Sequence, residues 1–168
     1  MTMHTPDDTA SITIELPDEA ATLALGARLA NRLMPGMVVY LKGNLGAGKT
    51  TLVRGILRAL GYAGRVKSPT YTLLESYVLS KLTLQHYDLY RMIDPREWLD
   101  AGFRDDCNAA TLCLVEWPEK AEGLLPKPDL VIRLDMAGEG RTARIEALSA
   151  RGRKEMQSWQ LVDRQQEN

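Results

Sequence analysis

The order of hydrophobic and polar positions in the first third of the chain predicts alternating strands and helices. Residues 12–16 alternate between apolar and polar side chains, which is typical of a short strand. From Asp18 onward, leucines and alanines recur every three or four residues, the period of an amphipathic helix. Residues 37–41 form a nearly continuous apolar run, as in a strand covered on both faces, and residues 49–60 have the pattern of a helix that Gly61 ends.

The rest of the chain adds hairpins to this pattern. Two pairs of segments are typical of β-hairpins: residues 71–79 with 82–90, and residues 129–135 with 141–148. The other expected elements are a short helix over residues 94–101, an apolar strand over 111–116 and a last helix over 150–161. Strands that alternate with helices early and form hairpins later predict an α/β sandwich, with a central mixed β-sheet flanked by helices.

Length and composition narrow the class of protein. A chain of 168 residues predicts one domain over residues 1–163, with a frayed tail at 164–168. The formal net charge of −1 gives no general attraction to DNA or to a membrane surface. No apolar run reaches the roughly 18 residues of a membrane helix, and residues 1–10 lack the apolar core of a signal peptide. Cys107 and Cys113 have no metal-ligand spacing. From all these features together, we expect a cytoplasmic protein without membrane or DNA partners.

A glycine-rich motif follows the strand predicted at residues 37–41. Residues 43–50 match the phosphate-binding pattern G-x-x-x-x-G-K-[ST] at every fixed position. The glycines let the backbone turn successive N–H groups toward one centre, and the following helix adds the positive end of its dipole. Lys49 is expected to reach the β- and γ-phosphates of a nucleoside triphosphate, and the Thr50 hydroxyl to bind Mg²⁺. The loop residues expected to bind the nucleotide are Gly43, Asn44, Leu45, Gly46, Ala47, Gly48, Lys49, Thr50 and Thr51.

Two acidic residues are candidates for handling the metal ion and the attacking water. A P-loop enzyme needs a carboxylate at the end of a neighbouring strand. Period-two geometry puts Leu84, His86 and Asp88 on one strand face, which turns polar at its carboxyl end. Glu116 follows four apolar residues, as in a Walker B strand with glutamate in place of aspartate. The alternative for both acids is a solvated side chain at the end of a strand.

Two further positions near the motif remain open on the sequence alone. The segment Ser68-Pro69-Thr70 follows the P-loop helix, where switch proteins carry a threonine that senses the γ-phosphate, but it also fits an ordinary turn. Trp117 follows Glu116 directly. Its ring has the chemistry to stack on a base or a partner, or to pack in the core.

Four motifs in order carry a resemblance to a known family. They are residues 43–51, residues 68–72 (Ser-Pro-Thr-Tyr-Thr), residues 86–91 (His-Tyr-Asp-Leu-Tyr-Arg) and residues 115–118 (Val-Glu-Trp-Pro). Together they closely resemble the TsaE family, the bacterial ATPase of tRNA threonylcarbamoyladenosine biosynthesis. The resemblance extends from about Ile12 to Leu148.

The resemblance implies a single domain, a P-loop NTPase-like α/β sandwich that binds ATP and Mg²⁺. It implies two partner proteins, TsaB and TsaD, which modify adenosine 37 of tRNAs that read ANN codons, so that tRNA is reached only through the complex. For single residues, the resemblance implies that Lys49 binds phosphate, that Thr50 binds the metal, and that Asp88 and Glu116 form an acidic pair near the metal. It implies a switch threonine at Thr70 and a nucleotide or partner surface at Trp117. It also implies that Glu19 and Thr22 lie near the adenine.

The expected reaction is hydrolysis of ATP to ADP and phosphate. Glu116 is expected to position the water, Asp88 to hold magnesium, and Lys49 to neutralise phosphate charge, with Thr70 sensing the γ-phosphate. Turnover without partners is expected to be slow. The alternatives are a small-molecule kinase and a nucleotide-gated binding module. A small GTPase is disfavoured because no Asn/Thr-Lys-x-Asp run is present to select guanine.

Overall fold

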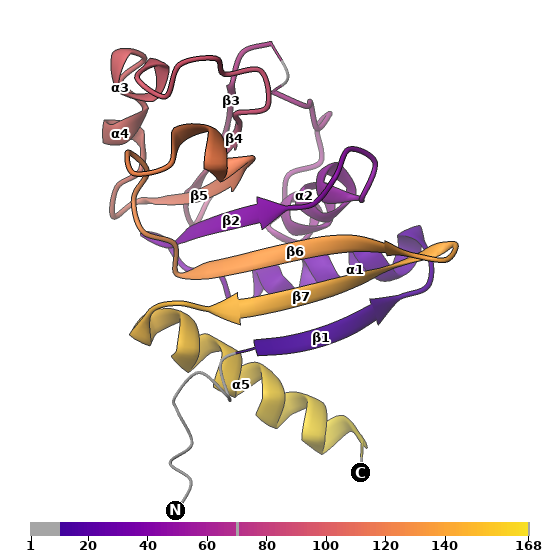
Figure 1. The fold of residues 1–168 in the computed structure, drawn as a ribbon. Helices are drawn as coiled ribbons and strands as arrows, with labels where there is room; N and C mark the ends of the chain where they lie inside the picture. Colours follow the sequence, from indigo (N-terminus) through magenta and orange to yellow (C-terminus); the bar gives the residue numbers. More distant parts are fainter. Residues whose placement is uncertain (1–10, 70, 168) are drawn as a thin grey trace, which may run out of the picture.

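The computed structural model describes residues 11–69 and 71–167, and a mixed sheet runs through the middle of them (Figure 1). The seven strands lie in the order β1-β7-β6-β2-β5-β4-β3. Their bounds are β1 Ser11–Leu16, β2 Val38–Lys42, β3 Leu74–Val78, β4 Thr83–Asp88, β5 Thr111–Glu116, β6 Leu130–Ala137 and β7 Gly140–Ala147. Each strand predicted from the sequence is present, and the prediction of an α/β fold around a mixed sheet is confirmed.

Helices follow most of the strands. They are α1 Glu19–Ala30, α2 Lys49–Ala59, α3 Glu97–Asp100, α4 Phe103–Asp106, the 3₁₀ helix η2 Pro118–Ala121, and α5 Ala150–Glu167. The short helices α4 and η2 were not predicted. The helix expected over residues 94–101 corresponds to α3 alone, and the left-handed backbone of Gly102 separates it from α4. The last helix begins at the expected residue and extends beyond Leu161 to Glu167. The division into a domain and a tail stays a prediction.

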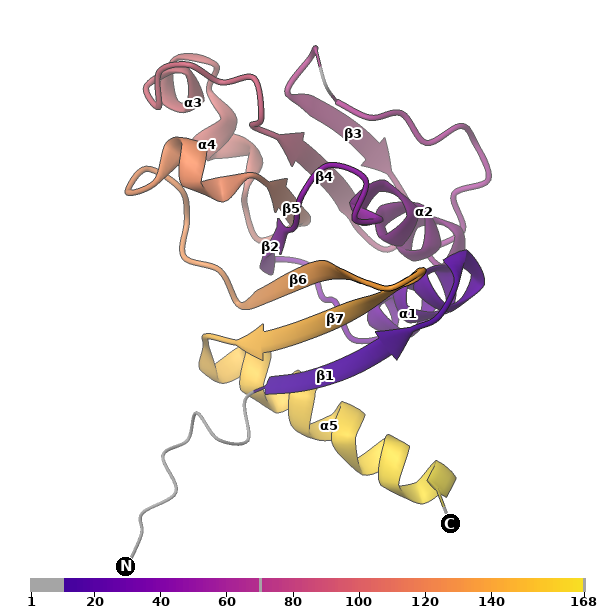
Figure 2. The ribbon, with the colours of Figure 1, turned by 45° about the vertical axis from the view of Figure 1, so that its right-hand side comes forward.

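The four central strands run parallel. β2 pairs in parallel with β5 and β6, and β4 pairs in parallel with β5, whereas β1, β7 and β3 join antiparallel. The carboxyl ends of β2, β4 and β5 therefore meet at one edge of the sheet. The segment that joins β2 to α2 leaves from that same edge (Figure 2).

The two faces of the sheet are covered by different elements. Figures 1 and 2 show α1 and α2 together on one side and α3, α4 and η2 on the other. Leu41, Leu84 and Leu114 point to the α1–α2 side and belong to the larger apolar core. Tyr87 and Val115 point the other way and belong to a second, smaller core. This alternation follows the period of two along a strand, and it decides which side chains reach the edge beside α2.

The helices α1 and α2 touch through two glycines. A Cβ atom added at Gly26 would lie 2.6 Å from the carbonyl oxygen of Leu52, and one at Gly55 would lie 2.5 Å from that of Leu23. Distances below 3.0 Å to backbone are not tolerated, so any side chain at these positions would push the helices apart. The close approach at Leu23 and Gly26 fixes α2, and with it the loop at its start, against α1.

Alanine at Gly55 is expected to destabilise the protein by about 1–3 kcal/mol, because the added methyl group forces the two helices apart. Helix propensity alone predicts the opposite sign, a gain of about 1 kcal/mol for Gly→Ala inside a helix. Urea unfolding of wild type and Gly55→Ala measures the difference. A variant as stable as wild type, or more stable, would show that the helices are not in backbone contact.

Candidate functional site

The loop between β2 and α2 is shaped by residues that adopt left-handed backbone angles. Gly43 has a φ of 146° and Gly48 a φ of 105°, a region that L side chains rarely adopt. A Cβ atom at Gly43 would also lie 2.5 Å from the carbonyl oxygen of Leu134 on the neighbouring strand. The motif glycines at these two positions are thus required by the path of the chain.

The first turn of α2 has no side-chain cap, whereas that of α1 has one. Asp18 caps α1, and its Oδ1 accepts a hydrogen bond from the N–H of Ala21 at 2.8 Å. Gly48 is the N-cap of α2 and has no side chain to do the same. The first N–H groups of α2 therefore face outward with the positive end of the helix dipole, which favours an anion. One loop amide already has a partner, since the N–H of Ala47 donates to the carbonyl oxygen of Asn44 at 3.1 Å.

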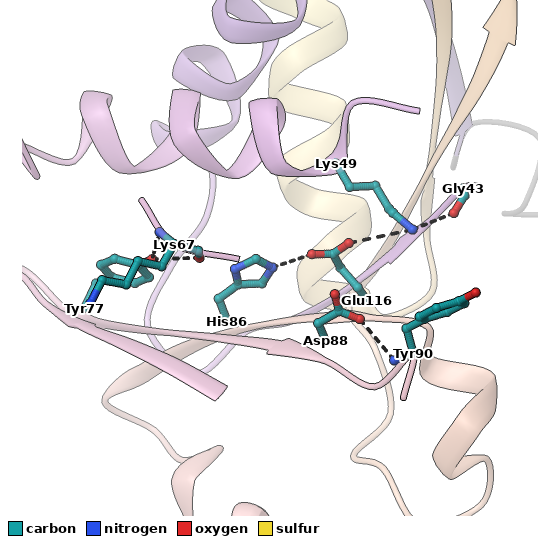
Figure 3. Close-up of polar contacts among 8 residues, drawn as sticks. All are labelled: Gly43, Lys49, Lys67, Tyr77, His86, Asp88, Tyr90 and Glu116. Carbon is teal, nitrogen blue, oxygen red and sulfur yellow. Dashed lines mark hydrogen bonds and ion pairs between the residues drawn. The ribbon is translucent and has the colours of Figure 1, made fainter. Parts of the chain in front are cut away.

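Three buried polar side chains form a row beneath the start of α2 (Figure 3). Lys49 Nζ donates to the carbonyl oxygen of Gly43 at 2.5 Å and lies 3.7 Å from Glu116 Oε1. The other carboxylate oxygen of Glu116, Oε2, lies 2.6 Å from His86 Nε2. Lys49 is 6% exposed, Glu116 3% and His86 0%. Buried charges persist only when they are paired, and here the ammonium and carboxylate groups face each other.

Asp88 lies beside this row at the end of β4. It is the register partner of Glu116, so the two acids lie next to each other on neighbouring strands. Its Oδ1 accepts a hydrogen bond from the N–H of Tyr90 at 3.0 Å. Burial raises the pKa of the Asp88 carboxyl above its ordinary value; the bond from Tyr90 opposes the rise, and the negative charge of Glu116 adds to it.

The donor atoms at this edge fit a magnesium ion. Asp88 and Glu116 supply carboxylate oxygens, and Thr50 at the exposed start of α2 supplies a hydroxyl. Hard oxygen donors are what Mg²⁺ prefers, and an ion shared with a nucleotide takes only one or two carboxylates from the protein. In the described parts of the chain, no three His, Cys, Asp or Glu side chains surround a single point.

Trp117 forms a wall beside Lys49. Lys49 Nζ lies 4.3 Å from the centre of the Trp117 ring, and the ring of Tyr90 packs against the tryptophan at 5.0 Å. Trp117 has a left-handed backbone with a φ of 56°, unusual for a bulky residue. Its side chain is half-buried. The ring lines a cavity and also packs against the smaller core, so the roles left open by the sequence stay open.

A cavity of about 400 Å³ opens over these groups. It is lined by the glycine loop, the start of α2 and the ends of β4 and β5, with residues Leu45, Gly46, Gly48, Lys49, Thr50, Thr51, Ser68, Asp88, Tyr90, Arg91, Glu116 and Trp117. Arg91, the last residue of the motif at residues 86–91, is a lining residue, and its guanidinium lies 4.8 Å from the centre of the Tyr71 ring. The candidate switch residue Thr70 lies outside the described residues.

A second cavity of about 190 Å³ lies on the other side of the glycine loop. Glu19 and Thr22 from α1 line it together with Gly46, Gly48 and Thr51, so the loop separates the two cavities. The turn between β6 and β7 completes it with residues 139–141. Arg141 donates from Nη2 to the carbonyl oxygen of Gly46 at 3.1 Å. Sequence reasoning missed this turn, because no local pattern shows that a hairpin distant in sequence returns to the loop.

Replacing Asp88 by asparagine is expected to raise the melting temperature of the nucleotide-free protein at pH 7. A raised pKa means that the folded state favours the protonated acid, so ionised Asp88 costs stability as pH rises above its unfolded value of 3.8. Asparagine removes that charge, and its oxygen still accepts from Tyr90. The difference in melting temperature between Asp88→Asn and wild type should shrink at lower pH, because the aspartate of wild type becomes protonated.

Thermal melts at pH 7 and pH 4 measure the effect, with Asp94→Asn as the control. Hydrogen bonds from Arg96 lower the pKa of Asp94, so its ionised form is the favoured one and its neutralisation should give no gain. A melting temperature of Asp88→Asn at or below that of wild type at pH 7 would contradict the assigned cause of the shift.

Parallel strands bring the carboxylates to one edge of the sheet, and at the same edge a glycine-rich loop leads into a helix. This arrangement places the chain in the P-loop NTPase-like class of α/β domains. The crystal structure of Bacillus subtilis YdiB has the same fold. It superposes with a TM-score of 0.75 and 29% sequence identity, covering 91% of this chain and 96% of that one. No helix in the described part of the chain combines the length and apolar character needed to cross a membrane.

The family within this class follows from the sequence comparisons. The model of the family "Threonylcarbamoyl adenosine biosynthesis protein TsaE" matches residues 16–145. The protein of that name from Haemophilus influenzae is 42% identical over 148 residues, which cover 85% of this chain and 94% of the relative. The one from Bacillus subtilis is 40% identical over 123 residues, covering 73% and 75%. The chain therefore belongs to the TsaE family, as the four ordered motifs predict.

Proposed function

We propose that this protein binds ATP with Mg²⁺ and hydrolyses it to ADP and phosphate in support of tRNA threonylcarbamoyladenosine biosynthesis. The observation that carries the proposal is the buried pair of Lys49 and Glu116 at the floor of the larger cavity, 3.7 Å apart and directly below the open start of α2. An ammonium group next to unfilled amides suits a triphosphate, and an acid within the same cavity suits an attacking water.

Each residue has a distinct task in the proposed reaction. Lys49 turns from the Gly43 carbonyl to the phosphates and neutralises the charge that develops on their oxygens. Glu116, released from the ammonium group, holds the water in line with the γ-phosphorus and accepts its proton. Asp88 and Thr50 hold Mg²⁺, which supplies charge neutralisation at the phosphates when it is bound.

The smaller cavity is the proposed place of the adenine base. It begins at the glycine loop, on the side of α1, and two residues expected near adenine, Glu19 and Thr22, line it. The base and the phosphates would then lie on opposite sides of Gly46 and Gly48, which line both cavities. Arg141, which is hydrogen-bonded to the carbonyl oxygen of Gly46, would close the cavity around the base.

The family name supports a role in threonylcarbamoyladenosine biosynthesis, and the resemblance adds the partners TsaB and TsaD in the cytoplasm. Arg91 lines the cavity, but its guanidinium lies over the Tyr71 ring. An arginine at the transition state contributes about 10³–10⁵ in rate, so we expect slow turnover while no arginine reaches the phosphates. The partner complex is proposed to complete the site.

The test is phosphate release from ATP by the purified protein, alone and with TsaB, TsaD and tRNA. The expected result is slow release alone and faster release with the partners present. Equal rates in both conditions would contradict the role of the partners. Saturable binding without phosphate release in either condition would instead favour a nucleotide-gated binding module, and phosphate transfer to a small acceptor would favour a kinase.

A further inference from the structure

His86 is a fully buried polar residue to which the proposed reaction gives no task. It lies on β4 two residues before Asp88 and on the same face of the sheet. Leu84, two residues further back on that face, is equally buried and packs in the apolar core. A side chain at position 86 that only filled space would be expected to be apolar too, since burying an imidazole removes two nitrogens from water.

The two imidazole nitrogens differ in their surroundings. Nε2 lies 2.6 Å from Glu116 Oε2, and because a carboxylate only accepts, the ring donates this hydrogen bond. Nδ1 is buried without a hydrogen-bond partner in the described part of the chain. A buried nitrogen without a partner is costly. The bond to Glu116 is therefore the interaction that explains an imidazole at this position.

The two partners of the Glu116 carboxylate differ in whether they keep their contact with it during the proposed reaction. Lys49 reaches Oε1 from the flexible end of a long side chain, at 3.7 Å, and the proposed reaction needs its ammonium group at the phosphates. His86 reaches Oε2 from a rigid ring in the sheet, at a shorter distance, and has no second task. Figure 3 shows His86 and Lys49 on opposite sides of the carboxylate. When Lys49 leaves, His86 remains.

We infer that His86 is a positioning residue, whose Nε2–H fixes the Glu116 carboxylate so that its other oxygen faces the cavity when Lys49 turns to the triphosphate. This inference rests on the proposed function, because it assigns His86 a role in the hydrolysis through Glu116. His86 itself does not touch the nucleotide or the water. Without it, Glu116 would rotate about its side-chain bonds, and the water would lose its fixed acceptor.

Three substitutions separate positioning from simple packing. His86→Met keeps a similar volume without a donor, His86→Gln keeps an N–H near the Nε2 position, and His86→Asn is polar but too short to reach Glu116. For His86→Met and His86→Asn we expect kcat for ATP hydrolysis to fall about 10–100-fold, the usual cost of losing such a supporting bond, while His86→Gln recovers most of it. Binding of MgATP, measured by calorimetry, should stay within about twofold of wild type in all three.

A double substitution tests whether His86 acts through Glu116. In a Glu116→Gln background, adding His86→Met should change kcat by no more than about twofold, because the group being positioned is already gone. An additive loss in the double variant would overturn the inference. So would a His86→Met protein with the kcat of wild type, or equal losses of kcat in His86→Gln and His86→Asn. If His86→Met loses nucleotide binding, the comparison of glutamine with asparagine decides.

Failure of this inference is distinct from failure of the proposed function. If wild type releases no phosphate from ATP with its partners present, the hydrolysis itself is wrong, whatever the variants do. If wild type hydrolyses ATP and His86→Met does so equally fast, only the role of His86 is wrong.

Discussion

Alanine at Lys49 should reduce ATP hydrolysis by on the order of 10³-fold, to near the limit of detection. Lys49 is the cation buried at the floor of the larger cavity, next to the uncapped first turn of α2. Its side chain is already in place, because Gly43 and Glu116 hold the ammonium group below the loop. Removing it takes away the charge that the phosphate oxygens need in the transition state, and it also leaves the buried Glu116 carboxylate without its cation.

Lys42→Ala is the matched control for this variant. Lys42 ends β2 directly before the glycine loop, but it lines a different cavity with Tyr40 and Pro118, on the opposite side of the sheet. Its loss should leave the hydrolysis rate within about twofold of wild type. Phosphate release by both variants in the presence of the partner proteins is the measurement. Near-normal hydrolysis by Lys49→Ala would contradict the assignment of the phosphate site.

Alanine at Glu116 should separate binding from catalysis. We expect MgATP to bind and turnover to fall by about 10²–10⁴-fold, the usual contribution of a general base. The carboxylate lies at the end of β5, 3% exposed, with one oxygen 3.7 Å from Lys49 and the other 2.6 Å from His86. This position suits contact with a water above Lys49. Binding survives because the loop amides and Lys49 remain.

Glu119→Ala serves as the control, since Glu119 is an exposed acid three residues further on, in the 3₁₀ helix η2. It should hydrolyse ATP at the rate of wild type. Nucleotide binding by calorimetry and phosphate release at saturating ATP give the two quantities separately for each variant. Normal turnover in Glu116→Ala would show that another group positions the water, and lost binding would show that Glu116 serves mainly the metal.

The sequence predicts the elements of the site because their patterns are local. The glycine loop is a fixed motif, and the acids Asp88 and Glu116 end apolar strands whose period of two determines their face. The rule that parallel strands present their carboxyl ends to one edge then brings them together, and the register pairs these two acids directly.

Features that depend on contacts between distant segments could not be predicted from the sequence. The order of the strands places β6 and β7 between β2 and β1, which brings the turn at residues 139–141 beside the glycine loop. The bond from His86 to Glu116 joins two strands thirty residues apart in the chain. The left-handed backbone of Trp117 also has no local signal, since bulky residues rarely adopt it. Such features arise from tertiary packing, which the periodicity of a single segment does not encode.

Equilibrium binding of labelled ATP in the presence of Mg²⁺ tests the central claim most directly, because the glycine loop and Lys49 are proposed first of all as a triphosphate site. The predicted result is saturable binding to one site per chain, displaced by unlabelled ATP more readily than by GTP and weakened in Lys49→Ala. No saturable binding to wild type, with TsaB and TsaD present, would contradict the claim that residues 43–50 hold a nucleotide.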